Sequence, residues 1–142
     1  MTSTEQKIVD EPAFVPEETY TCYIDQYLEA VRGIEGVIAV YQMGGVSTPG
    51  ISDIDLIVVV DGSFRPQQYN QLSVRRVFDD DEQAAYLFTH DVMILDEASF
   101  ERLEYIFFAS NLQLLDGEEL HLASPSDEEM RHLRFAILCD IS

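Results

Sequence analysis

The sequence predicts an α/β (α+β) domain in which helices pack mainly on one face of a mixed β-sheet. Two observations predict it. The hydrophobic pattern changes along the chain from helical spacing to the continuous apolar runs of buried strands. These segments follow in the order helix, strand, strand, helix, strand, helix, strand, helix. With 142 residues, 46% of them hydrophobic, the chain is long enough for one domain with a substantial core.

The first half of the chain predicts one helix and two strands. Apolar residues recur at helical spacing over Tyr20–Val31, and we expect its tyrosines to pack in the core. Gly33 and Gly36 end this helix. A strand follows at Val37–Tyr41, and the next, Asp53–Val60, is apolar on both faces beyond its acids, as in a central strand.

The second half predicts further helices and strands in alternation. A helix, a long strand, a helix and a short strand are expected at Pro66–Val77, Ala85–Leu95, Glu97–Ala109 and Leu112–Leu115. Asp96 is placed to cap the second of these helices. Ser126 and Glu129 form a capping box that opens a last helix.

Residues 1–16 are polar and acidic, and they lack the basic and apolar regions of a signal peptide, so they predict a flexible tail. The domain is expected to occupy residues 17–142. Its apolar last helix has no glycine cap, which leaves open a homodimer contact or truncation before a C-terminal helical domain. No apolar run approaches the ~20 residues that span a bilayer, so no membrane partner is expected.

The cysteines and the charge bear on the compartment and the partners. Cys22 and Cys139 are too few for a disulfide framework, so we expect reduced core cysteines and a cytoplasmic protein. The net charge of −19, with eight basic residues, repels phosphate backbones and makes long nucleic acid an unfavourable partner. Such acidity also resembles proteins from a high-salt cytoplasm, which makes a halophilic origin a hypothesis.

Two carboxylates stand at the start of the strand Asp53–Val60. Because Asp53 and Asp55 are one residue apart, both project to the same side of a strand, roughly 6–7 Å from each other. Adjacent acids repel each other unless positive charge lies between them. A hard cation such as Mg²⁺ fits this position. In a chain with 27 acidic residues the pair can also arise by chance, so the preceding loop is informative.

That loop carries glycines and hydroxyl groups. Gly44-Gly45 follows an apolar run and lets the backbone turn sharply, so that its amides can approach a phosphate. Ser47, Thr48 and Ser52 add hydroxyl donors. These five residues are the candidates for nucleotide and phosphate binding.

This order of features resembles the signature of the DNA polymerase β-like nucleotidyltransferase superfamily, and the chain resembles a minimal nucleotidyltransferase domain. The residues that carry the resemblance are Gly44-Gly45 and Ser52-Asp53-Ile54-Asp55-Leu56. It extends over roughly residues 20–120, where the segment from Asn111 to Gly117 resembles the later edge strand of the family. Members usually carry a third acid on a following strand, and Asp91 is the residue that matches it.

The resemblance implies a nucleotidyltransferase fold and a metal-assisted reaction. A nucleoside monophosphate would pass from a nucleoside triphosphate such as ATP to a hydroxyl of a small molecule or protein, with release of pyrophosphate. Asp53, Asp55 and Asp91 would be the catalytic residues and would hold two Mg²⁺ ions, with Mn²⁺ as an alternative. The identity of the acceptor does not follow from the resemblance.

The glycine loop departs from many active relatives, which place an arginine there, because it holds no Arg or Lys. Phosphoryl-group chemistry depends on such positive charge. A second interpretation therefore stays open: an inactive or weakly active nucleotidyltransferase-like binding module, such as the antitoxin partner of a helical toxin protein. A third is an unrelated α/β domain with a chance acid pair.

Two further features have open interpretations. Arg75-Arg76 is the only adjacent basic pair, and it could contact a triphosphate or lie at a solvated helix end. His90 is expected to face away from Asp91, because neighbouring strand residues point to opposite faces, and to be packed or solvent-facing.

Overall fold

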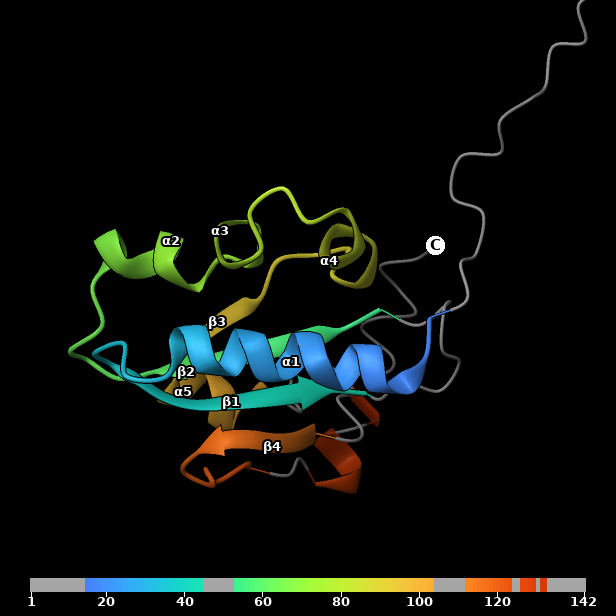
Figure 1. The fold of residues 1–142 in the computed structure, drawn as a ribbon. Helices are drawn as coiled ribbons and strands as arrows, with labels where there is room; N and C mark the ends of the chain where they lie inside the picture. Colours follow the sequence, from blue (N-terminus) through green and yellow to red (C-terminus); the bar gives the residue numbers. More distant parts are fainter. Residues whose placement is uncertain (1–14, 45–52, 104–111, 124–125, 130, 133–142) are drawn as a thin grey trace, which may run out of the picture.

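The computed structural model describes residues 15–44, 53–103, 112–123, 126–129 and 131–132. Four strands form one sheet in the order β3-β2-β1-β4, as Figure 1 shows. Their bounds are Val37–Met43 for β1, Asp55–Val60 for β2, Met93–Asp96 for β3 and Leu112–Gly117 for β4. Strand β1 runs antiparallel to β2 and β4, whereas β2 runs parallel to β3. The predicted mixed sheet is confirmed.

Helices cover the sheet unequally. Helices α1 to α4 lie on one face and α5 on the other (Figure 1). The helices are α1 Glu17–Val31, the 3₁₀ helix Pro66–Gln68, α2 Tyr69–Leu72, α3 Val74–Val77, α4 Glu82–Leu87 and α5 Glu97–Glu101. Helices packed mainly on one face are therefore confirmed for the described part of the chain.

The alternation of side chains along β2 divides the core into two clusters. Val58 faces α1 and packs with its buried tyrosines, including Tyr27. Ile57 and Val59 face the other way and pack with Phe100 of α5. The tyrosine stripe on α1 is thus core, as expected. By the same alternation, Asp55 belongs to the face of Ile57 and Val59.

The long strand predicted at Ala85–Leu95 is wrong. Residues 82–87 form helix α4, and only Met93–Asp96 is strand. The physical reason is local capping and packing: Asp81 accepts a hydrogen bond from the amide of Ala84, and Ala84 and Leu87, at helical spacing, are both fully buried. Asp91 consequently lies in the connection between α4 and β3.

The single helix predicted at Pro66–Val77 is instead three short helices, namely the 3₁₀ helix, α2 and α3. Ser73 is extended, with φ −64° and ψ 129°, and separates α2 from α3. The carboxylate of Asp91 accepts hydrogen bonds from the hydroxyl of Ser73 at 2.7 Å and from the amide of Val74 at 2.9 Å. This distant acid stabilises a new helix start that local sequence does not indicate.

The expected helix ends are largely confirmed. Gly33 and Gly36 have φ of 87° and 91° after α1. A side chain at Gly36 would meet atoms of Phe64 at 2.6 Å, so glycine is required there. Asp96 caps α5 through the amide of Ser99, and that helix is confirmed as far as Glu101, while residues 104–111 lie outside the described residues.

The ends of the chain are described only in part. The predicted capping box is present, with reciprocal hydrogen bonds of 3.2 Å between Ser126 and Glu129. The predicted tail at 1–16 lies outside the described residues except for its last two, and Val15, 2% exposed, already packs in the core.

One expectation for the cysteines is corrected, since Cys22 is exposed and free rather than part of the core. It lies on the solvent face of α1, opposite the tyrosine stripe. Cys139 lies outside the described residues. Among the residues that the structure describes, no helix has the length and apolar character needed to cross a membrane.

We expect Tyr27→Phe to lower the free energy of unfolding by about 1–3 kcal/mol. The Tyr27 side chain is fully buried, and its hydroxyl donates to the carbonyl of Leu72 at 2.6 Å. Without the hydroxyl, this buried acceptor loses its partner. Urea unfolding followed by circular dichroism measures the change.

The matched control is Tyr69→Phe, at a ring that is 49% exposed. This variant should stay within about 0.5 kcal/mol of the wild type. Equal effects of the two substitutions would show that the Tyr27 hydrogen bond contributes nothing specific to the packing of α1 against α2.

Candidate functional site

The acid pair lies at the beginning of β2. Asp55 is the first residue of the strand, and Asp53 precedes it by two residues. Between them Ile54 is buried, and its amide donates to the carbonyl of Leu87 at 2.8 Å. This hydrogen bond holds the backbone of Ile54, whose side chain packs in the core cluster that contains Val58 and the tyrosines of α1.

The two carboxylates are close enough to interact. Burial raises the pKa of Asp55 above its ordinary value of 3.8, and the negative charge of Asp53 raises it further, while nearby His90 opposes the shift. Both effects penalise the charged form of Asp55. The arrangement is therefore one that a cation would stabilise.

The segment before β3 contributes two more residues to this site. The hydroxyl of Thr89 donates to a carboxylate oxygen of Asp53 at 2.6 Å. His90 is exposed and acts electrostatically on Asp55. Sequence reasoning missed Thr89 and left His90 without a role. The signal was present, because residues just before a strand parallel to β2 reach the same edge of the sheet as Asp53 and Asp55.

Asp91 lies at this edge, but its carboxylate is directed elsewhere. The parallel pairing begins with Ile57 opposite Met93, so Asp55 and Asp91 each stand two residues before that pair. Besides the two bonds at the start of α3, its carboxylate accepts one from the amide of Val92 at 2.9 Å. Within the described ranges, no group of three or more His, Cys, Asp or Glu side chains is arranged to hold a metal ion.

The glycine turn begins beside the acid pair. Met43, the last residue of β1, pairs with Asp55, and Gly44 follows it with a positive φ of 73°. That conformation suits glycine and turns the chain out of the sheet. The other predicted phosphate-binding residues, Gly45, Ser47, Thr48 and Ser52, lie outside the described residues.

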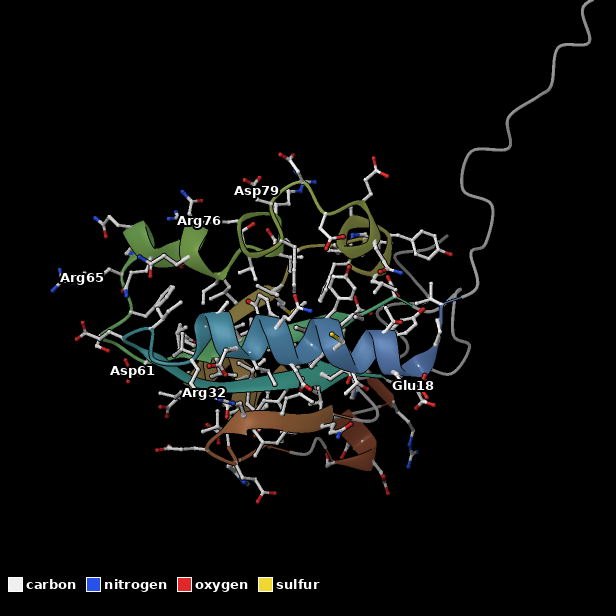
Figure 2. All side chains as sticks on the ribbon, viewed as in Figure 1. Glu18, Arg32, Asp61, Arg65, Arg76 and Asp79 are labelled. Carbon is white, nitrogen blue, oxygen red and sulfur yellow. The ribbon has the colours of Figure 1, made fainter. Side chains whose placement is uncertain are left out.

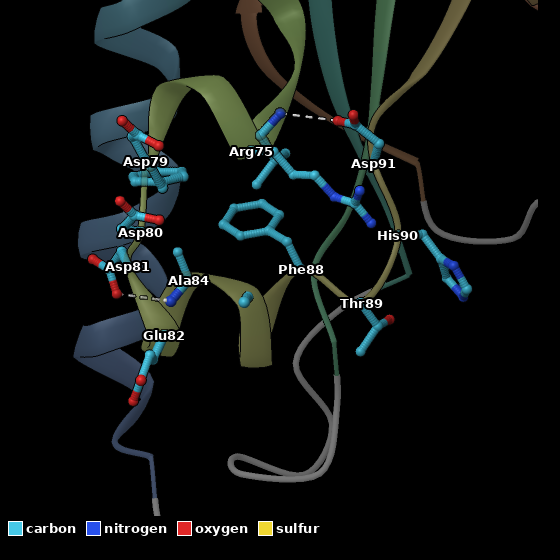
Figure 3. A pocket seen from close by; sticks show the side chains of 13 residues that line it. Arg75, Asp79, Asp80, Asp81, Glu82, Ala84, Phe88, Thr89, His90 and Asp91 are labelled. Atoms are coloured by element: carbon cyan, nitrogen blue, oxygen red, sulfur yellow. Dashed lines mark hydrogen bonds between the residues drawn. The ribbon is translucent and has the colours of Figure 1, made fainter.

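A cleft of about 620 Å³ adjoins the acid pair through Thr89 and His90 (Figure 3). Arg75 stands on the same side of this cleft as His90 in the close view, and the acids of residues 79–82 form the opposite wall. Phe88 lies between the two walls (Figure 3), and Phe78, which also lines the cleft, stacks on it with ring centres 5.5 Å apart. The cleft thus has one side that carries Arg75, His90 and Asp91 and an opposite wall made of acids.

The acidic wall is tied to the rest of the fold through Asp81. Its carboxylate accepts from the amide of Ala84 at 3.0 Å and from the hydroxyl of Tyr23 at 2.9 Å. These hydrogen bonds, that of Ala84 first, hold the pKa of Asp81 below its ordinary value, so it stays ionised at neutral pH. The bond to Tyr23 joins this wall to α1.

Comparisons with protein-family models, with curated proteins and with solved structures found no match to this chain.

We expect Asp55→Asn to raise the melting temperature at pH 7. A carboxyl group whose pKa is raised on folding opposes folding wherever it is ionised, and that penalty disappears as the pH falls to 3.8 and below, where the group is protonated in both states. The stabilisation by the variant should therefore shrink as the pH is lowered. Differential scanning calorimetry from pH 7 to pH 4 in metal-free buffer measures it.

Asp61→Ala, at the other end of β2, is the control, and its melting temperature is expected to change in the opposite direction. The amide and hydroxyl of Ser63 donate to Asp61 at 2.8 Å and 2.6 Å and hold the pKa of its carboxyl below 3.8. Its contribution is stabilising above pH 3.8 and is lost as the pH falls through the lowered value. This variant should melt lower at pH 7, and a lower melting temperature for Asp55→Asn as well would contradict the electrostatic account.

Proposed function

We propose that this chain is a Mg²⁺-dependent nucleotidyltransferase. It would move a nucleoside monophosphate from a nucleoside triphosphate to a hydroxyl of a small molecule or protein, with release of pyrophosphate. The observation that carries the proposal is the close Asp53–Asp55 pair at the start of β2, in which the charge of one acid opposes ionisation of the other. The cleft that Thr89 lines, next to its hydrogen bond with Asp53, provides space for a substrate.

The donor set fits the proposed metal. Asp53 and Asp55 offer carboxylate oxygens, which Mg²⁺ and Mn²⁺ prefer, and their mutual repulsion is relieved by a cation. When bound, Mg²⁺ supplies positive charge to the phosphate oxygens of the nucleotide. Thr89 orients Asp53 for this role by its 2.6 Å hydrogen bond, and pairing with Met43 fixes the backbone of Asp55.

Asp91 is proposed as the third acid, with a specific requirement. A role as ligand of a second ion needs its carboxylate to exchange its hydrogen bonds with Ser73 and Val74 for the metal. In the arrangement described above, Asp91 stabilises the start of α3.

The same observation favours the second candidate function, a nucleotidyltransferase-like module that acts by binding, such as the partner of a helical toxin protein. An acid held by three hydrogen bonds in a structural role gives the site only two carboxylates for metal. Such a module would bind its partner protein without catalysing nucleotidyl transfer.

Isothermal titration of MgATP, and then of the other three triphosphates, into the wild type and the Asp53→Asn/Asp55→Asn variant tests the proposal. We expect Mg²⁺-dependent binding by the wild type that the double variant loses. Pyrophosphate release with a productive acceptor should fall by at least about 100-fold, the order of loss expected when a main electrostatic group is removed from a site.

Glu118→Gln/Glu119→Gln is the matched control, because it removes two exposed acids that lie outside the cleft. It should bind the nucleotide like the wild type. A folded wild type that binds none of the four triphosphates, with Mg²⁺ or Mn²⁺, would refute the nucleotidyltransferase proposal and favour the binding module.

A further inference from the structure

The cleft that is lined by Thr89, which donates to Asp53, also contains an arginine with no ion pair to a described residue. Arg75 is the second residue of α3, is exposed, and lines the cleft together with Thr89 and His90. Within the part of the chain that the structure describes, Arg75 has neither an ion pair nor a side-chain hydrogen bond.

The direction of this side chain is informative. Although residues 79–82 place four acids on the opposite wall, the guanidinium of Arg75 extends toward the side of the cleft that carries His90 and Asp91 (Figure 3). In a chain with a net charge of −19, an arginine that forms no ion pair with the described carboxylates is available to a ligand anion. The next residue, Arg76, projects outward from the same helix (Figure 2) and does not line the cleft.

One three-residue segment connects Arg75 to the acid pair. Thr89 donates to Asp53 at 2.6 Å, and Asp91 accepts from Ser73 and Val74, the two residues before Arg75. His90, between them, acts on Asp55. The segment therefore holds the acid pair on one side and the start of α3 on the other, so that the positions of Arg75 and the pair are coupled.

We infer that Arg75 binds the phosphate chain of the nucleotide and supplies the positive charge that the glycine loop lacks. This inference rests on the proposed function. Arginine suits the role, because its planar guanidinium donates two parallel hydrogen bonds to phosphate oxygens and is always charged. A positive charge that contacts the phosphates from α3 replaces the arginine that many members of the resembled family carry in the glycine loop and that this sequence lacks.

Titration of magnesium tripolyphosphate and of MgATP into the wild type, Arg75→Gln and Arg76→Gln tests the inference. Tripolyphosphate has no base or sugar, so it isolates recognition of the phosphates. We expect Arg75→Gln to raise the dissociation constant of both ligands about tenfold, consistent with the loss of a hydrogen-bonded charge pair. Arg76→Gln, with the same change in net charge, should stay within about twofold of the wild type.

The remaining outcomes separate the inference from the proposed function. If the wild type binds and Arg75→Gln binds equally well, the role of Arg75 is refuted and the proposed function stands. If Arg75→Gln and Arg76→Gln weaken binding equally, a specific contact of Arg75 with phosphate is refuted. It is also refuted if Arg75→Gln weakens the binding of MgATP but not that of tripolyphosphate. If the folded wild type binds neither ligand, the inference is refuted, and titration of the other three triphosphates then decides the proposed function.

Discussion

The parallel pairing of β2 with β3 is the constraint on which the site depends. A parallel neighbour cannot be reached by a tight turn, so the chain leaves β2 and crosses one face of the sheet through α2, α3 and α4 before it returns. This crossover brings residues 89–91 to the edge where β2 begins. The acids of one strand thereby meet the hydroxyl and imidazole that precede the other, although 36 residues separate Asp53 from Thr89.

The site combines unfavourable electrostatics with strong local support. Asp53 and Asp55 repel each other, and burial adds a further penalty for Asp55. The surrounding core offsets this cost, since Ile54 and the strand beyond Asp55 are almost wholly buried. Such a charge conflict held on a rigid strand is typical of functional sites, where ligand binding relieves it. In the acidic wall of the cleft, the carboxylate of Asp81 is instead stabilised, because it accepts hydrogen bonds from Ala84 and Tyr23.

The elements that were predicted correctly from the sequence are those whose determining residues lie within a few positions of one another. The tyrosine spacing of α1, the apolar run of β2 and the caps at Asp96 and Ser126 are of this kind. The errors depend on distant contacts. The apolar stretch after Asp81 suits a strand as well as a helix, and the break at Ser73 depends on Asp91, 18 residues away. Likewise the acid pair was visible in the sequence, whereas the residues that contact it from the neighbouring strand were not.

The short connection between α4 and β3 has a consequence for how this chain can vary. Five residues, 88–92, separate the two elements, and three successive ones serve different neighbours: Asp53, Asp55 and the start of α3. An insertion or deletion of one residue would displace these three side chains from the neighbours that they now serve. Natural variants should therefore keep the length of this connection.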